Sequence, residues 1–215
     1  MLQAPSAHRP HPAWNPSLMA GSAVVALLAL FAASTARAET PTKTPAASSV
    51  VKLVPAQSEI AFTSKQMGVP VDGRFRQFDA QIDFNPKQPQ AGHVNFTVDL
   101  GSASLGAAET EAELAKAAWF NTAKFPKATF VSTALRGVGG NKFEAAGKLT
   151  IKGATRDLVV PVTLTQGTGS STATGSFTLK RTAFKIGDGE WADTSMVADD
   201  VLVKFKLTLT GMAPL

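Results

Sequence analysis

The chain has 215 residues and no cysteine, so disulfides, thiolate chemistry and a lipid anchor on a cysteine are excluded. Its formal net charge is +5, and removal of the first 38 residues, which hold two arginines and no acidic residue, lowers this charge to about +3. Such a weak charge, carried by lysines scattered along the chain, does not predict a nucleic-acid-binding surface.

The first 38 residues have the features of a secretory signal peptide. An uncharged apolar run covers residues 20–33, which is too short to span a bilayer. Ala36-Arg37-Ala38 follows it as a small-x-small cleavage signal. We therefore expect cleavage after Ala38, a mature protein without a transmembrane segment, and a periplasmic location. The alternative is a membrane anchor that stays attached.

Residues 39–49 consist mainly of Pro, Thr, Ala and Ser and show no apolar periodicity. This composition predicts a disordered linker. The remainder, residues 50–215, has the size of one domain.

Two-residue alternation of apolar and polar side chains dominates this domain and predicts β-strands with one buried face. Turn signals such as Asn85-Pro86 and Lys152-Gly153 separate the strands. The alternation predicts about eight strands, near residues 59–63, 78–84, 93–100, 128–134, 142–151, 158–164, 177–179 and 201–210.

One short helix is expected in the long connection between the third and fourth strands. Thr110 and Glu113 form a capping-box pattern, and good helix formers continue to Ala118. Its apolar stripe is thin, so the helix must lie against a larger surface. Together with the helix, the aromatic residues that follow it, Trp119 and Phe120, would form part of the wall that closes the barrel interior.

An antiparallel series of this kind forms a two-sheet sandwich or closes into a barrel, and an eight-stranded barrel is wide enough to enclose one small ligand. The domain after residue 38 has twelve Phe, two Trp and no Tyr, so its inward face suits a hydrocarbon. Small inward residues, namely Ala80, Ala128, Ala134, Ala145 and Gly147, leave volume that a neighbour or a ligand must fill. The alternative is a solid barrel whose phenylalanines pack on one another.

The candidate lining residues for a lipid are the large apolar side chains of the strands and of the helical connection. They are Ile60, Phe62, Phe75, Phe78, Ile82, Phe84, Phe96, Val98, Leu114, Trp119, Phe120, Phe125, Phe130, Phe143, Leu149, Phe177, Leu179, Trp191 and Phe205.

Three arginines are candidates for contact with a ligand head group. Arg181 continues the spacing of Phe177 and Leu179, which places its guanidinium at the rim of an apolar interior. There it would face an anionic head group, form a structural ion pair or reach solvent.

Arg74 and Arg76 are the other two candidates. They share the inward parity of Phe78 if their strand is regular, whereas a bulge near Gln77 would turn Phe75 inward instead.

Pro161 interrupts the strand near residues 158–164 on its outward parity. Proline cannot donate to a ladder, so this strand is expected at a bulge or at an incompletely closed seam.

The sequence predicts neither an enzyme nor a metal or cofactor site. His93 is the one histidine after residue 38 and has the polar parity of its strand, so zinc and haem lack ligands. Asp199 and Asp200 are adjacent and would point to opposite faces of a strand. No nucleophile elbow or phosphate-binding glycine loop occurs.

An ordered set of motifs resembles the YceI-like, polyisoprenoid-binding proteins over roughly residues 50–209. The set consists of Ser58-x-Ile60-x-Phe62, Gly73-x-Phe75-x-x-Phe78, Trp119-Phe120 to Phe125-Pro126-x-Ala128-Thr129-Phe130, Leu149-Thr150-Ile151-Lys152-Gly153-x-Thr155-Arg156, Arg181-x-x-Phe184-x-Ile186-Gly187, and Trp191 through Asp200-Val201. The resemblance implies a lipocalin-like antiparallel barrel, exported to the periplasm, that encloses a long isoprenoid chain or similar amphiphile and is commonly dimeric.

The chain departs from the pattern that follows the family's barrel arginine. Ala183 replaces an acidic residue, and Lys185 stands where glycine is common, which adds positive charge near the expected mouth. The leading hypothesis is a periplasmic carrier of a polyisoprenoid, quinone-like or fatty chain. The alternatives are a ligand-free structural or partner-binding barrel of the cell envelope and an enzyme acting on a lipid.

Overall fold

The computed structural model describes residues 50–215, so the predicted signal peptide (1–38) and linker (39–49) lie outside the described residues. Within residues 50–215, no helix has both the length and the apolar character that a membrane-spanning helix requires.

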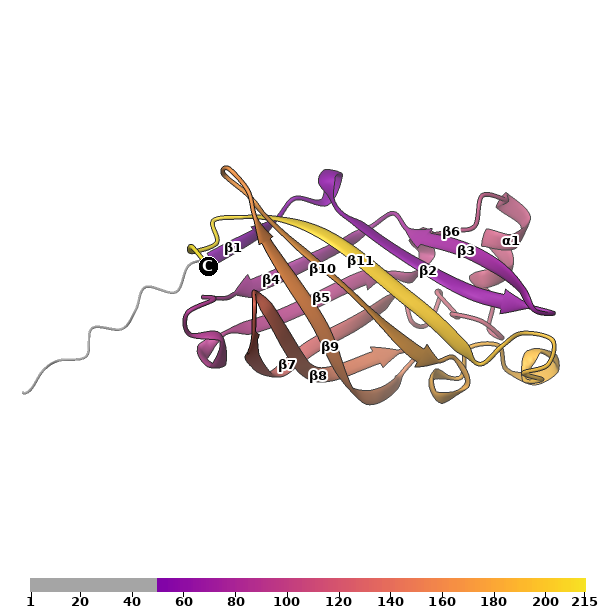
Figure 1. Ribbon diagram of the computed structural model, residues 1–215. Helices are drawn as coiled ribbons and strands as arrows, with labels where there is room; N and C mark the ends of the chain where they lie inside the picture. The colour runs from indigo at the N-terminus through magenta and orange to yellow at the C-terminus, as the bar shows by residue number, and fades with distance from the viewer. Residues whose placement is uncertain (1–49) are drawn as a thin grey trace, which may run out of the picture. The chain divides into compact units, whose positions relative to one another are not determined.

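Antiparallel strands wind around one axis (Figure 1). The strands are β1 (Val50–Leu53), β2 (Glu59–Gln66), β3 (Val69–Phe75), β4 (Phe78–Asp83), β5 (His93–Asp99), β6 (Ala103–Ser104), β7 (Lys127–Gly139), β8 (Lys142–Ile151), β9 (Ala154–Gln166), β10 (Ser171–Lys180) and β11 (Asp200–Thr210). One α-helix, α1 (Ala108–Leu114), lies between β6 and β7. Short 3-10 turns cover Pro55–Gln57, Pro89–Ala91, Leu100–Ser102, Thr182–Phe184 and Gly189–Trp191.

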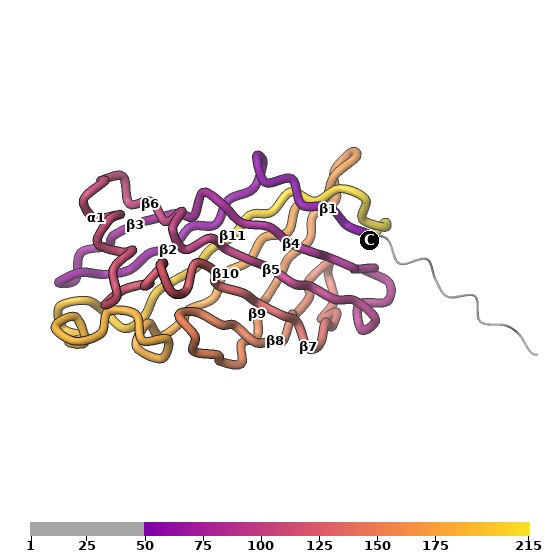
Figure 2. Tube along the Cα trace, turned by 180° about the vertical axis from the view of Figure 1, so that it is seen from behind, coloured from indigo at the N-terminus to yellow at the C-terminus, as the bar shows by residue number. Residues whose placement is uncertain are grey.

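The sheet closes on itself because β1 pairs with both β4 and β11, as in Val51↔Ile82 and Leu53↔Leu209. β2 follows β1 and pairs with the same strand, β11, so β1 and β2 together form one barrel strand. β3 pairs with β2 and leads into β4, and β6 pairs with β3 and follows β5, so these segments form two further barrel strands (Figure 2). The predicted eight-stranded antiparallel barrel with one helix between its third and fourth strands is confirmed.

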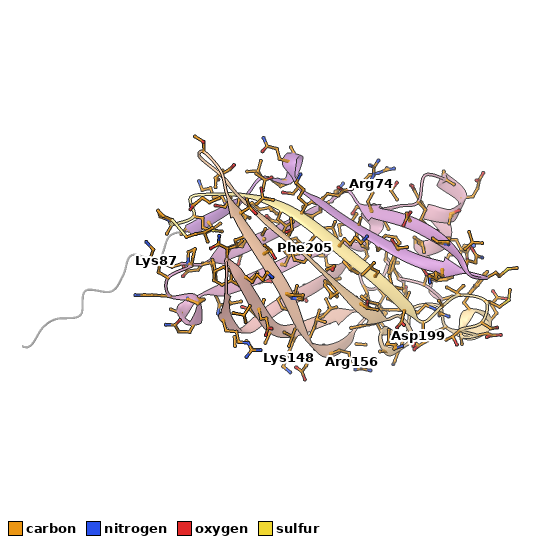
Figure 3. The ribbon with its side chains drawn as sticks, in the orientation of Figure 1. Arg74, Lys87, Lys148, Arg156, Asp199 and Phe205 are labelled. Carbon is orange, nitrogen blue, oxygen red and sulfur yellow. The ribbon has the colours of Figure 1, made fainter. Side chains whose placement is uncertain are left out.

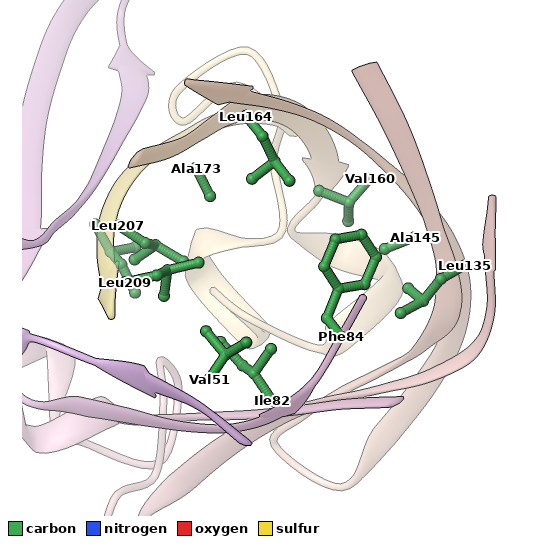
Figure 4. Packing of buried hydrophobic residues seen from close by; sticks show 11 residues of the cluster. Val51, Ile82, Phe84, Leu135, Ala145, Val160, Leu164, Ala173, Leu207 and Leu209 are labelled. Carbon is green, nitrogen blue, oxygen red and sulfur yellow. The ribbon is translucent and has the colours of Figure 1, made fainter. Parts of the chain in front are cut away.

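Apolar side chains of the strands point into the barrel. Figure 4 shows Val51, Ile82, Leu135 and Leu207 of β1, β4, β7 and β11 converging with Phe84, which follows β4, at the end that holds the chain's C-terminus. A second cluster, which includes Leu100, Phe120 and Phe184, lies toward the end that holds α1. The core is therefore built from the barrel's own inward faces.

A register shift in β7 changes the predicted pattern of that strand. The pairing with β8 shifts between Ser132 and Ala134, so the inward face continues from Ser132 to Leu135, both buried. Ala134 is exposed, and its predicted inward position is wrong. Two-residue counting fails there because a bulge adds one unpaired residue.

The chain also breaks its strand at Arg76 and Gln77, between β3 and β4. This break is the bulge that the sequence left open as one alternative, and it places Phe75 inside the barrel and Arg74 outside. The regular-strand alternative is wrong.

The helix begins earlier and is shorter than predicted, and Thr110 does not cap it. The N-cap position is Ala107, which has no side chain that could accept a hydrogen bond from the first turn of the helix. Instead, Glu111 accepts hydrogen bonds from the Ser104 hydroxyl (2.8 Å) and from the amides of Leu105 (3.2 Å) and Gly106 (3.3 Å). The carboxylate thereby joins the helix to the end of β6.

The seam predicted from Pro161 is present. β10 pairs with β11 along its full length, but its ladder with β9 has four pairs and ends at Thr174↔Thr163. Continuing that register would set Pro161 opposite Ser176, where proline has no N–H to donate.

Candidate ligand cavity

The barrel is hollow and encloses a cavity of about 430 Å³. That volume lies within the range of pockets that enclose small ligands. All predicted lining residues except Phe78 and Phe125 lie on its wall, with Arg181 and Leu105 among further wall residues. The alternative of an interior filled by the phenylalanine rings is therefore not what this sequence folds into.

The exceptions lie just beside the cavity. Phe78 packs on the ring of Phe96, with ring centroids 6.0 Å apart. Phe125, in the connection between α1 and β7, packs against the turn between β8 and β9, where a Cβ on Gly153 would be 2.9 Å from its ring. The predicted positions of Phe78 and Phe125 on the cavity wall are wrong, because each half-buried ring packs against a neighbouring part of the protein beside the cavity.

Several phenylalanine rings lie flat against the barrel wall because glycines lie beneath them. A Cβ on Gly73 would be 2.3 Å from the ring of Phe62, and a Cβ on Gly175 would be 2.4 Å from the ring of Phe205. Phe62 is paired with Gly73, and Phe205 with Gly175, across neighbouring strands. A missing side chain on one strand thus holds an aromatic ring of the next strand, an arrangement known to compensate for glycine in sheets.

Gly147 plays the same part for Phe130. A Cβ there would be 2.6 Å from the Phe130 ring and 2.4 Å from the carbonyl oxygen of Val131. The volume left by this predicted small residue is therefore filled by a neighbour, whereas Ala128 and Ala145 open directly on the cavity.

Arg181 is buried, with 1% of its surface exposed. Its five N–H groups donate to backbone carbonyls of the segment between β10 and β11, namely those of Val197 (2.7 Å), Ile186 (2.9 Å), Gly187 (3.1 Å), Ala198 (3.2 Å) and Asp193 (3.4 Å). Burial lowers the pKa of the guanidinium, and the charges of Asp199 and Asp188 raise it in part.

This arrangement corrects the prediction for Arg181. It is neither a rim side chain in solvent nor a partner in a direct ion pair, and it has no N–H left for a ligand head group. Gly187 has φ +75°, and a Cβ there would lie 2.4 Å from Nη1 of Arg181. Arg181 is therefore a residue that positions the loop over this end of the barrel.

Lys152 also holds this loop, through hydrogen bonds from its ammonium group. It is buried, and its Nζ donates to the carbonyl of Ala118 (3.1 Å), to the carbonyl of Lys185 and to Oδ2 of Asp188 (3.1 Å). The amides of Gly187 and Asp188 also donate to the carbonyl of Ala118, each at 2.9 Å. Three connections of the barrel meet at this point.

Arg74 and Arg76 lie outside the cavity, so the inward position on which their predicted head-group role depended is wrong. Arg74 is exposed and extends from the outer surface, as do Lys148 and Arg156 (Figure 3). Arg76 donates to the Ser104 hydroxyl (2.5 Å) and lies 3.6 Å from the carboxylate of Glu111. The strand break described above turned both side chains outward.

The cavity wall has few polar groups near α1, and Arg181 is its one cation among the described residues. Ser64 and Gln66 of β2 and Thr110 and Glu113 of α1 line this end. Sequence reasoning missed them, although Ser64 and Gln66 continue the two-residue spacing of Phe62. Glu113 pairs with Lys116 at 2.5 Å.

Two indole N–H groups have no acceptor. Nε1 of Trp119 and Nε1 of Trp191 are both buried and make no hydrogen bond with any described residue. Their rings lie 5.5 Å apart, and both residues line the cavity. Buried donors without acceptors are rare in folded proteins and require an explanation. Within residues 50–215, no group of three or more His, Asp or Glu could hold a metal ion.

Comparisons with known proteins agree with this architecture. Protein YceI of Salmonella arizonae is 39% identical over 92 residues, which cover 43% of this chain and 46% of that protein. The chain thus aligns with less than half the length of these curated relatives. The crystal structure of Burkholderia cenocepacia BcnA is similar with a TM-score of 0.70 and 43% identity, over 73% of this chain and 98% of that one.

A polyisoprenoid binding domain from Saccharophagus degradans has the same fold, with a TM-score of 0.61 at 14% identity over 76% of this chain and 99% of that domain. The family model described as YceI-like domain matches residues 52–209. With most of the barrel matched, the chain belongs to the YceI-like family.

Proposed function

We propose that this protein binds a long-chain amphiphile, such as a polyisoprenoid, quinone-like or fatty chain, inside the barrel and carries it through the periplasm. The observation that supports the proposal most directly is the cavity of about 430 Å³ with its aromatic and aliphatic wall. An apolar cavity lacks the contacts that a packed core would make, and a hydrocarbon chain would restore them. The polyisoprenoid-binding relative of the same fold supports the choice of ligand class.

The energetics of such a cavity suit a carrier. Burial of about ten methylene groups at about 0.8 kcal/mol each gives a gross driving force near 8 kcal/mol. Ordering of the chain and association subtract from this figure, which leaves binding in the micromolar range or tighter.

The polar groups of the wall favour a neutral head group. The cation on the wall, Arg181, has all its donors engaged, and Glu113 adds a carboxylate. The free indole N–H groups of Trp119 and Trp191 are instead suited to a carbonyl or hydroxyl oxygen, once a ligand has displaced the groups that now cover them.

The test is a titration with a C15 isoprenoid alcohol, farnesol, and with its diphosphate. The alcohol should bind about ten-fold more tightly or better, since burying an uncompensated charge is costly. Tighter binding of the diphosphate would contradict the head-group part of the proposal. Absence of binding for both, together with no lipid in organic extracts of the purified protein, would contradict the carrier function itself.

A matched pair of variants tests whether the ligand lies in the cavity. Ala145 opens on the cavity, whereas its neighbour Ala146 does not line it. Ala145→Phe should weaken farnesol binding by about ten-fold or more by occupying the ligand's volume. Ala146→Phe should leave binding unchanged, and an equal effect of both variants would place the ligand elsewhere.

A further inference from the structure

The turn between β2 and β3 and the loop before β11 together expose a patch that we call the apolar tip, made of Met67, Val69 and Met196. Their exposed fractions are 69%, 64% and 45%. The amide of Met67 donates to the carbonyl of Met196 at 2.8 Å, and Gln66 forms a β-bridge with Val197. Figures 1 and 2 both show this turn beside the loop, so the two segments form one surface feature.

The apolar tip is continuous with the wall of the cavity. Gln66, Val71 and Val197 line the cavity, and each lies within two residues of a member of the tip. Seen along the chain, the same two segments therefore carry the cavity wall on one side and exposed methionines on the other. A ligand that enters the cavity between the β2–β3 turn and the loop before β11 would therefore pass this surface.

The backbone conformation of the turn does not favour a methionine at position 67. Met67 has φ +50° and Gly68 has φ +82°. Two-residue hairpin turns with both angles positive favour Asn-Gly, because asparagine tolerates this conformation better than a long side chain does. A methionine that is both strained and largely exposed contributes little to the fold, and such strain is a reason to look for a function.

The tip carries no charge. Residues 66–71 and 194–198 include no Asp, Glu, Lys or Arg. A partner protein or an anionic surface recognised by charge would leave a basic or acidic cluster, whereas an uncharged and apolar tip fits the interfacial region of a lipid bilayer. Met side chains adapt readily to irregular apolar surroundings.

We propose that the apolar tip inserts into the surface of a lipid bilayer, where the barrel takes up or releases its ligand. The inference rests on the proposed function, because a long-chain ligand stays in membranes and crosses water poorly. Three exposed side chains give weak and reversible insertion, which suits a carrier that must leave the membrane again. Since the tip lacks cationic residues, its binding should be insensitive to salt.

The experiment measures flotation of the protein with neutral vesicles of phosphatidylcholine and phosphatidylethanolamine, at about 0.05 M and about 0.5 M NaCl. The test variant combines Met67→Asn with Met196→Gln, and Met67→Asn also suits the turn better than the native residue. The matched control combines Val138→Thr with Val159→Thr, which are exposed by 49% and 54% and lie away from the tip.

We expect about ten-fold less vesicle-bound protein and slower transfer of a long-chain isoprenoid quinone from vesicles for the tip variant alone. Titration with farnesol in solution should give the same affinity for wild type and both variants, since none of the four residues lines the cavity. Equal vesicle binding by the tip variant and wild type would overturn the proposal.

Other results would overturn it in distinguishable ways. Binding that disappears at high salt would show attraction by charge instead of insertion. A change in the oligomeric state of the tip variant without vesicles would show that the tip contacts a second copy. Failure of wild-type protein to bind farnesol would contradict the proposed function, and with it the reason for a membrane partner.

Discussion

At the scale of single residues, two buried cations hold the loop that closes one end of the barrel. Arg181 donates to five carbonyls of the segment between β10 and β11, and Lys152 joins that segment to the turn after α1. Each carbonyl is a strong acceptor, and leaving one of them buried without a donor would destabilise the folded protein. The cavity therefore depends on side chains that do not themselves supply a site for a charged ligand.

Replacing Arg181 tests this role. Arg181→Met keeps an unbranched side chain but removes all donors, and we expect a loss of about 3 kcal/mol in the free energy of unfolding. In a domain of this size the melting temperature should fall by about 6–12 °C. Urea and thermal unfolding measure both quantities. The exposed Arg74 serves as control, and Arg74→Met should change stability by less than about 0.5 kcal/mol.

Arg181→Lys separates charge from geometry. It keeps the positive charge but offers three donors from one point, which cannot reach all five carbonyls. Its stability should lie between those of wild type and Arg181→Met. A stability equal to wild type for both variants would show that the loop is held by other contacts.

At the scale of elements, neighbouring strands share the work of keeping the barrel open. Glycines on β3, β8 and β10 accommodate the rings of Phe62, Phe130 and Phe205. Without these glycines the rings would have to swing toward the axis, because the wall would offer them no space. The hollow interior is thus a property of strand pairs rather than of individual phenylalanines.

Gly73→Ala tests this coupling. Gly73 does not have a positive φ, and the ring of Phe62 is the group that a new Cβ would meet. We expect a loss of about 1–3 kcal/mol in unfolding free energy from overpacking, together with weaker farnesol binding as the ring moves into the cavity. Phe62→Leu in the same chain should restore part of both. Increased stability without a change in binding would contradict this account of the open interior.

The contact between α1 and β6 should depend on pH. The Ser104 hydroxyl, followed by the amides of Gly106 and Leu105, lowers the pKa of Glu111 below its ordinary value of 4.5, although burial opposes this. A carboxyl whose pKa is lowered in the folded state stabilises the fold above its unfolded pKa. That contribution disappears as pH falls through the folded pKa.

We therefore expect the free energy of unfolding to fall as pH is lowered from about 5 to about 3. Glu111→Gln should make this fall shallower, measured by urea unfolding at each pH. The Ser195 hydroxyl and amide also lower the pKa of Asp193, so some dependence should remain in the variant. Glu109→Gln, a change at an exposed position of the same helix, should follow the wild-type curve, and an identical fall for Glu111→Gln would contradict the assignment.

At the scale of the whole domain, the barrel combines a closed ladder, a partly open seam at β9 and β10, and a hollow interior with a mostly apolar wall. An interior of this kind gives up packing contacts that a solid core would have. Occupation by a hydrocarbon chain should therefore stabilise the folded state as well as define its function.

Thermal unfolding with and without ligand checks this expectation. A ligand at about one hundred times its Kd stabilises the folded state by about 2.7 kcal/mol, which corresponds to a rise in melting temperature of about 5–11 °C. A long-chain isoprenoid alcohol should produce this shift, whereas a short alcohol with the same head group should not. Equal shifts from both would show that the chain is not the part that is bound.

The sequence by itself determined the strands and most of the cavity wall. The period of two along each strand depends only on local geometry, and it identified about eight strands and wall residues from Ile60 to Phe205. A barrel instead of a two-sheet sandwich was what the resemblance to the YceI-like family implied, and the connecting helix was expected from its run of helix-forming residues. The proline signal likewise predicted the seam, because a missing N–H is a property of Pro161 alone. The signal peptide and linker remain predictions from composition.

Only the tertiary structure decided which side chains face the interior beyond each bulge, which groups Arg181 binds and whether the barrel is hollow. Bulges at Ser132–Ala134 and at Gln77 shifted the parity of whole segments, which removed Ala134, Arg74 and Arg76 from the interior. Arg181 had the predicted inward parity, but its partners are carbonyls of a loop up to seventeen residues away. Hollowness was also undecided, because periodicity reports which faces are buried, whereas an open cavity depends on how rings and glycines of different strands fit together.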